Sequence, residues 1–503
     1  MEMGIRQSDD ESAPADDACT PSHIDRVHFE PHADEWHTLV ARRPLTTFQS
    51  TLRAQLGLPL DRPIVMSGHQ CEFWHPGILA KWFAGEALAR RVGGTFVWLH
   101  VDQDTNDPGR LIVPAFDNAG GLIRQNIALV PPVTDVPTGS RPAARVDLSS
   151  SLAAVGAASR FDPCWLAGLG RIADSLNHFA GEPTLATQFG QASESLIPGA
   201  TRAPLDAANP RVHTVTTGHL SSTDGFAALV AALRRDAVRA VDSHNRAAAR
   251  MPEAGIRQLG LKVSADHPAR VELPLWRVRP GVPRVGVMLS HLAEIPPHEL
   301  RPRALLMTGL ARLGACDAFI HGTGGGMYDR ITDEWLHDWL CGSTDPETIE
   351  LAHALPLAPP LVCTATARLA FDSERGGVGI AEARAARHLA HRARHDPQLL
   401  GDRDAGLAKR ELVARIDRSE DRAERAMLFQ RLHALLERSR AEHAHRLASL
   451  DHESRVLARK AAEEPLVRER TWPFPLYPEA TLWELRRRIE DQIMHGAQTG
   501  TSA

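Results

Sequence analysis

Two strand-to-helix junctions constrain the fold of this chain more than any other feature. Each has a short apolar run, a turn that contains histidine and glycine, and then a helical pattern, at residues 64–92 and 318–339. Such junctions are typical of α/β proteins with a parallel sheet, in which ligands bind outside the carboxyl ends of the strands. The sequence therefore predicts an α/β core with a ligand site between the two junctions.

The first junction carries many groups that an anion can use. Gly68 permits a sharp exit from the strand, and Pro76 suits the first position of a helix. A helix N-terminus offers free N–H groups and a partial positive charge. His75-Pro76-Gly77 also matches three positions of the His-x-Gly-His element with which nucleotidyl-transferring enzymes hold phosphates. The candidate ligand-binding residues here are Gly68, His69, Gln70, His75, Gly77 and Lys81.

Acidic residues follow a second predicted strand at residues 95–101. Asp102, Asp104 and Asp107 leave this strand at the edge that carries the first junction. Asp102 and Asp104 could hold Mg²⁺ or act as a general base. With His69 and His100 they could instead form the metal cluster of a hydrolase. Acidic residues also populate strand-exit turns for local reasons alone.

The second junction is rich in glycine. We expect these glycines to form a loop with positive φ angles that brings main-chain N–H groups to a ligand, with a helix beginning near Tyr328. Met327 interrupts the G-x-G-x-x-G pattern, and no Lys-Ser/Thr pair follows. The candidate binding residues at this junction are Arg301, His321, Gly322, Gly324, Gly325, Gly326, Tyr328 and Asp329.

Composition narrows the class of protein. The net charge of −5 includes no basic excess that would indicate nucleic-acid binding. The 6 cysteines form no C-x-x-C pair, which favours a reduced cytoplasmic protein, and no stretch is apolar enough to span a membrane. Cys71 alone lies in a candidate site, where His69 or His75 could activate it, although a buried free cysteine is the commoner case.

The chain divides into four predicted segments. Residues 1–21 are acidic and rich in small residues, which predicts disorder. Residues 22–375 form the core, with a mostly helical lead-in to residue 62 and an insertion at about 108–210. Leucines at three- and four-residue spacing within 376–470 predict a helical hairpin or coiled coil, and through it a homodimer. Residues 471–503 are expected to pack back on the core.

In combination, these motifs resemble the cysteine-adding ligase family of bacillithiol biosynthesis. Residues 67–70, 76–81, 98–104, 300–302 and 321–328 follow the order of the family's motifs. The resemblance implies a Rossmann-like core with inserted connecting segments and a C-terminal coiled coil. It also implies a carbon–nitrogen ligase that joins an amino acid, cysteine in the family, to a small amine or sugar acceptor.

The resemblance and the residues together assign roles. We expect His69, His75 and Lys81 to stabilise phosphate charge, with ATP and Mg²⁺ as cofactors. Asp102 and Asp104 would bind Mg²⁺ or take a proton from the attacking amine. Two alternatives stay open: a metal-dependent hydrolase that uses His69, His100, Asp102 and Asp104, and a non-catalytic scaffold whose long helices recruit a partner.

Overall fold

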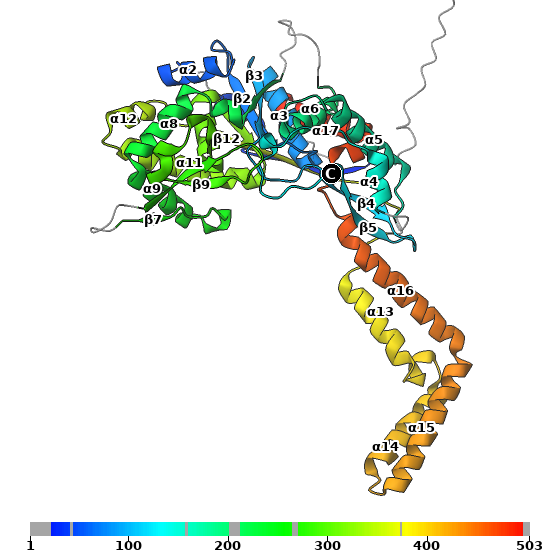
Figure 1. Ribbon diagram of the computed structural model, residues 1–503. Helices are drawn as coiled ribbons and strands as arrows, with labels where there is room; N and C mark the ends of the chain where they lie inside the picture. Colours follow the sequence, from blue (N-terminus) through cyan, green and yellow to red (C-terminus); the bar gives the residue numbers. More distant parts are fainter. Residues whose placement is uncertain are drawn as a thin grey trace, which may run out of the picture. The chain divides into compact units, whose positions relative to one another are not determined.

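The computed structural model describes residues 22–40, 44–155, 159–200, 212–263, 270–372 and 375–495 (Figure 1). The expectation of disorder at residues 1–21 lies outside this part of the chain. Two compact units are present. The sheet unit contains the described residues up to Pro114, Gln125–Leu369 and those from Arg470 onward, and the helical unit contains Ala115–Arg124 and Ala370–Glu469.

A six-stranded sheet forms the centre of the sheet unit, in the order β1-β12-β11-β2-β3-β6. Every neighbouring pair is parallel except β1 and β12, which are antiparallel. The predicted α/β class with a mainly parallel sheet is confirmed. The strands are β1 (His23–Glu30), β2 (Ile64–Gln70), β3 (Thr95–Val101), β6 (His213–Thr216), β11 (Ala318–His321) and β12 (Pro360–Arg368).

The prediction of a mostly helical lead-in was wrong at its start, because β1 is an edge strand. Only Ile24 of β1 is buried, so the strand shows no apolar alternation in the sequence. Its order comes from pairing with β12 along most of its length, from His23 to Glu30. The helix α2 (Thr47–Gln55) does follow in this region, with a capping box between Thr46 and Gln49.

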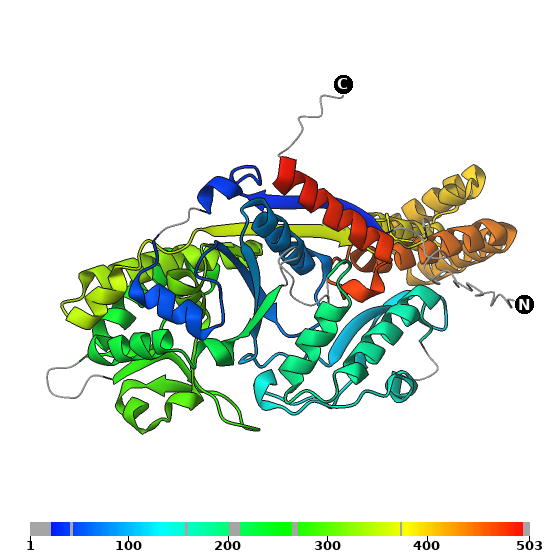
Figure 2. The same ribbon diagram turned by 90° about the horizontal axis from the view of Figure 1, so that it is seen from above.

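Each face of the central sheet packs on helices. On one face, Trp98 lies 4.6 Å from Trp74 and 5.1 Å from Trp82 between ring centroids, and Trp82 belongs to α3 (Pro76–Arg91). The expected extent of this helix is confirmed. On the other face, Met66 and Phe319 join the largest core cluster of the described residues. Figure 2 shows α17 (Glu479–His495) alongside α3.

Other elements surround this sheet. The segment expected to be an insertion, at about residues 108–210, contains two strands, β4 and β5, and three α-helices, α4, α5 and α6. Two of the remaining strands, β4 (Arg110–Phe116) and β5 (Leu122–Ala128), extend into the helical unit. The other strands and α-helices of the sheet unit are α1 (Trp36–Leu39), α4 (Leu148–Val155), α5 (Pro163–His178), α6 (Leu185–Ser195), α7 (Thr217–Leu220), α8 (Asp224–Arg235), α9 (Ala237–Arg250), β7 (Leu261–Lys262), β8 (Arg270–Arg277), β9 (Val285–Met288), β10 (Leu300–Pro302), α10 (Ala304–Leu310), α11 (Thr323–Gly342) and α12 (Pro346–Ala352).

The glycine-rich segment is helical, which corrects the predicted loop. Helix α11 begins at Thr323 rather than near Tyr328, and the described glycines with positive φ include none from 322–326. Glycine costs a helix about 1 kcal/mol relative to alanine at each position. Burial of Trp335 and Trp339 further along the helix anchors α11 in the core and offsets that cost.

The helical unit contains two helix pairs. Helix α13 (Ile380–Ala393) packs on α16 (Ala444–Val467), and α14 (Arg403–Arg418) packs on α15 (Arg422–Glu442) (Figure 1). The predicted leucine seam is not continuous, because the helix breaks at His443 between α15 and α16. The buried contacts are few, with Ala390, Ala393, Leu400 and Leu450 in one small cluster.

The structure also bears on two expectations from composition, namely membrane-spanning segments and the state of the cysteines. Among the described residues, no helix combines the length and the apolar character needed to cross a membrane. Cys71, Cys316, Cys341 and Cys363 are free thiols. Cys164, however, is disulfide-bonded, which departs from the expectation that every cysteine is reduced.

Candidate functional site

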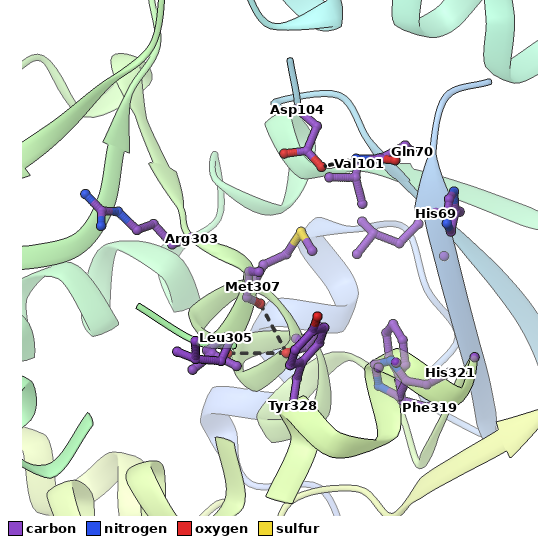
Figure 3. Close-up of a pocket in the computed structure, with 18 of the residues that line it drawn as sticks. His69, Gln70, Val101, Asp104, Arg303, Leu305, Met307, Phe319, His321 and Tyr328 are labelled. Atoms are coloured by element: carbon purple, nitrogen blue, oxygen red, sulfur yellow. Dashed lines mark hydrogen bonds between the residues drawn. The ribbon is translucent and has the colours of Figure 1, made fainter. Parts of the chain in front are cut away.

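Both junctions line one cavity of about 670 Å³ in the sheet unit (Figure 3). It opens at the carboxyl ends of β2, β3 and β11, and β2 and β11 are neighbours in the sheet although far apart in the chain. The expected meeting of the two junctions is confirmed. The expected residues that line the cavity are Gly68, His69, Gln70, His75, Gly77, Lys81, Asp104, His321, Gly322, Gly324, Gly325 and Tyr328.

Close packing fixes the backbone of the first junction. A Cβ at Gly68 would lie 2.5 Å from the carbonyl oxygen of Leu99 on β3, so only glycine fits there. His75 is the N-cap of α3, and its Nδ1 accepts a hydrogen bond from the Gly77 N–H at 3.0 Å. Gln70 donates to Asp104 at 2.7 Å. His75 and Gln70 therefore have local structural partners in addition to facing the cavity.

His69 has an acidic neighbour that the sequence did not single out. Its Nδ1 lies 3.6 Å from Glu72 Oε1, and Glu72 Oε2 accepts from Asn106 at 3.1 Å. Burial raises the pKa of Glu72 to about 7. Burial, together with Lys81 and His75, lowers the pKa of His69 well below its ordinary value. At neutral pH the imidazole is therefore neutral, and the carboxyl can hold a proton.

Lys81 is the least exposed basic residue of the cavity lining, at 4 %. Its Nζ donates to the carbonyl oxygen of Gly68 at 2.6 Å and lies 5.4 Å from the ring centroid of Trp98. Burial lowers the pKa of Lys81 to about 7. Lys81 is consequently not a permanent cation at neutral pH.

Asp102 and Arg301 do not line the cavity, which corrects their expected roles as ligand-binding residues. The Asp102 carboxylate accepts from the Gly218 N–H at 3.2 and 3.3 Å. Burial raises the pKa of Asp102, and Arg301 opposes that rise. Arg301 donates to the carbonyl oxygens of Leu300 and His298 at 2.8 Å. These contacts hold the loops behind the site.

The residues of the expected metal sites have other partners. Asp104 accepts from Arg284 at 2.8 Å as well as from Gln70. His100 lies 2.6 Å from Glu194 and 3.4 Å from Cys71, whose thiol is fully buried away from the cavity. Within the described chain, the one His/Cys/Asp/Glu group that could hold a metal ion is Asp402, Glu442 and His443, in the helical unit. The cluster expected of a hydrolase does not form.

At the second junction a buried ion-pair network supports His321. Its Nε2 pairs with Asp329, which is 1 % exposed and lies 3.2 Å from Arg312. Asp329 was expected to bind ligand, but its position behind His321 makes it a positioning residue. Arg312 also pairs with Asp333 at 2.7 Å. The network fixes the orientation of the imidazole that faces the cavity.

The first turn of α11 presents backbone to the cavity. Its N-cap, Gly322, supplies no side-chain hydrogen bond, so free N–H groups of the helix start remain available to a ligand. A Cβ at Gly325 would lie 2.5 Å from His321 Nδ1, whereas one at Gly324 would meet nothing within 4 Å. Gly326, another expected binding residue, lines a different pocket with Met327.

Arginines that the sequence did not single out form the opposite wall. Arg284 and Arg303 lie with their guanidinium carbons 4.6 and 4.1 Å from the ring centroid of Trp276. Arg303 donates to Glu272 at 2.7 Å. Burial raises the pKa of Glu272, but hydrogen bonds from Arg257, Gly260 and Arg303 outweigh it and lower the pKa to about 2. The only sequence signal was the density of arginine between residues 257 and 303.

The charge of the lining favours an anionic ligand. Among the described residues that line the cavity, Asp104 is the one acidic residue, and four are histidines. Five lining residues have basic side chains: Lys81, Arg257, Arg284, Arg303 and Arg470. Charged donors and a helix N-terminus in a partly enclosed cavity suit a phosphate or carboxylate.

Comparisons of the chain with protein-family models, with curated proteins and with solved structures found no match.

Proposed function

We propose that the protein is a carbon–nitrogen ligase with a Rossmann-like core. It binds a nucleotide or another phosphorylated or carboxylated substrate in the cavity, and joins an amino acid, with cysteine as the first candidate, to a small amine or sugar acceptor. The observation that carries the proposal is the excess of basic over acidic side chains on a cavity lined by both junctions.

The order of the parallel strands supports a Rossmann-like core. Numbered by their position in the chain, the five parallel strands β6, β3, β2, β11 and β12 lie in the order 3-2-1-4-5. This order is typical of nucleotide-binding doubly wound sheets, in which the ligand occupies the crevice where the order reverses. Here the reversal falls between β2 and β11, where the cavity lies.

Different lining residues would have different roles in the proposed reaction. The start of α11 and the two arginines on Trp276 would hold the anionic groups of the substrate and stabilise negative charge that develops in the transition state. His321, held by Asp329, would accept the proton of the attacking amine. Asp102 and Asp104 already accept hydrogen bonds from Gly218, Gln70 and Arg284, so they do not fit a Mg²⁺ site and no step is assigned to a metal.

Titration calorimetry tests the proposal. The full chain is titrated with ATP and, separately, with cysteine and other amino acids. Arg303→Gln removes a charged donor from the lining and should weaken binding of the anionic ligand about 10- to 100-fold, as expected for the loss of a charged hydrogen bond. Arg279→Gln is the matched control, because Arg279 is exposed and outside the cavity.

Binding should be followed by turnover. ATP consumption that depends on both an amino acid and an amine acceptor would establish a ligase. Absence of heat with ATP and with every amino acid would contradict the proposal, as would equal effects of Arg303→Gln and Arg279→Gln.

A further inference from the structure

Lysine is rare in this chain. It occurs only at Lys81, Lys262, Lys409 and Lys460, and arginine occupies the other 53 of the 57 basic positions. Arginine keeps its proton in proteins, whereas lysine gives it up readily when buried. Where a side chain serves only as a fixed positive charge, this chain almost always uses arginine. Lys81 is the exception that lies buried in a cavity wall, and among the described residues of the lining it is the only lysine.

The described surroundings of Lys81 offer an ammonium ion no counter-ion. Within the described residues, its one hydrogen bond is to the carbonyl oxygen of Gly68, at 2.6 Å. The indole of Trp98 and the fully buried Cys363 lie near its side chain, and His69 is the titratable group that faces it from β2. In the described part of the chain, no carboxylate lies within ion-pair distance of the amine. An ammonium ion without a counter-ion in such a site is costly, so the neutral amine is favoured.

A neutral amine on a cavity wall is a nucleophile. Burial lowers the pKa of Lys81 to about 7, so about half of the amine is unprotonated at pH 7. An ordinary lysine is unprotonated to only about one part in a thousand or less at that pH. Lysines activated by desolvation in this way react with carbonyl groups to form imines.

We propose that Lys81 forms an imine with the carbonyl group of an anionic ligand bound in this cavity. The chemical class is an aldehyde or ketone that also carries a phosphate or carboxylate. Its anionic group would bind Arg284 and Arg303 or the start of α11, which leaves the carbonyl carbon within reach of the amine. This proposal does not require the ligase reaction.

The step is balanced without another reactant. The lone pair of the Lys81 nitrogen attacks the carbonyl carbon, and the carbonyl oxygen takes up a proton to give a carbinolamine. The first of the two amine protons is the one that moves to this oxygen, and the second passes to the hydroxyl group, which leaves as water, so amine and carbonyl become imine and water. His69 can carry the proton, because its ring is neutral and its Nδ1 makes no hydrogen bond within the described residues.

Pyridoxal 5′-phosphate is a suitable probe, because it combines an aldehyde with a phosphate. The full chain is mixed with the probe at neutral pH, imine formation is followed by its visible absorbance, and borohydride fixes the adduct for peptide mapping by mass spectrometry. We expect modification of Lys81 at least about tenfold faster than that of the exposed Lys262, given its larger neutral fraction. Modification of the other lysines with Lys81 left intact would overturn the proposal.

Two variants and a pH profile complete the test. Lys81→Arg keeps a positive charge but cannot form an imine, so the fast label should disappear, whereas Lys262→Arg should leave it unchanged. If Lys81→Arg does not fold, the relative labelling rates of Lys81 and Lys262 in the wild-type protein still test the proposal. Labelling of Lys81 should level off above about pH 7, and labelling of Lys262 should keep rising toward about pH 10. Parallel profiles would refute the proposal, and the outcome does not depend on ATP binding.

Discussion

Individual side chains around the cavity owe their chemistry to burial. Glu72 and Lys81 carry opposite charges in water, yet burial moves the pKa of each to about 7. These pKa values could not be predicted from the sequence, because they depend on burial, and for Lys81 on neighbours such as Trp98, that only the folded chain creates. Composition identified candidate donors and acids, but it did not predict which of them would be neutral.

The raised pKa of Glu72 predicts a pH-dependent cost to stability. The folded pKa of about 7 exceeds the unfolded value of about 4.3, so the folded state binds more protons between these values. Stability therefore falls as pH rises from about 4.3 to 7, and the full cost applies above pH 7. We expect Glu72→Gln to stabilise the protein by about 3–4 kcal/mol at pH 8 and to have little effect at pH 4. Urea unfolding at both pH values measures this.

The exposed Glu253 provides a control for that measurement. Glu253→Gln should change the free energy of unfolding by less than about 0.5 kcal/mol at either pH. A Glu72→Gln variant that is equally stable to wild type at pH 8 would show that the carboxyl is not held in its protonated form.

Asp329 is expected to be more important for stability than Asp333, which pairs with the same arginine, Arg312. Asp329 and Arg312 are each 1 % exposed in their side chains, whereas Asp333 is 44 % exposed. Removing Asp329 takes the ion-pair partner from His321 and leaves the buried Arg312 with the more exposed Asp333 as its carboxylate partner. Asp329→Asn should lower the free energy of unfolding by about 3 kcal/mol, and Asp333→Asn by about 1 kcal/mol or less. Equal losses in urea unfolding would mean that Asp329 does not anchor the network.

At the scale of elements, apolar patterning predicted the strands and helices of both junctions, and β1, β4 and β5 were missed. β1 and β5 bury few residues, so pairing rather than local sequence keeps them in place. β4 does bury alternate residues, Leu111, Val113 and Ala115, but Pro114 interrupts its strand pattern. The start of α11 was misplaced for a related reason. Glycine indicated a loop, but the long buried face that begins at Ile331 continues the helix back to Thr323.

Two glycines of α11 should respond differently to alanine. A Cβ at Gly324 meets open space, so Gly324→Ala should stabilise α11 by up to about 1 kcal/mol through helix propensity. A Cβ at Gly325 would clash with His321, so Gly325→Ala should destabilise the protein by about 1–3 kcal/mol. Thermal unfolding of the two variants measures the difference. Similar shifts in both would indicate that His321 is free to move.

At the scale of the whole molecule, the meeting of the two junctions was predictable and the arginine wall was not. The first follows from a general rule of parallel sheets, which places ligand sites at the carboxyl ends of strands. Arg284 and Arg303 reach the cavity from the segment around β8 and β9, whose pairing follows no motif in the sequence. The arginine side chains of the cavity therefore depend on tertiary structure that local sequence patterns do not encode.

The helical unit offers a test of the proposed homodimer. Helices α14 and α15 expose apolar side chains, with Leu407 at 57 %, Met427 at 53 % and Phe429 at 44 %. Exposed apolar groups on a helix pair favour association with a second copy. The variant for the test lacks residues 402–443 and joins Gly401 to Ala444, which retains α13 and α16 with their buried contacts to each other.

Light scattering should give twice the chain mass of 55.0 kDa for the full chain and a single mass for the shortened chain. Ligand binding measured by calorimetry should be the same in both, because every residue that lines the cavity belongs to the sheet unit. A monomeric full chain would rule out the dimer, and a dimeric shortened chain would place the contact elsewhere. The residues removed in the variant do not line the cavity. Loss of binding in the shortened chain would therefore mean that the helical unit supports the cavity indirectly.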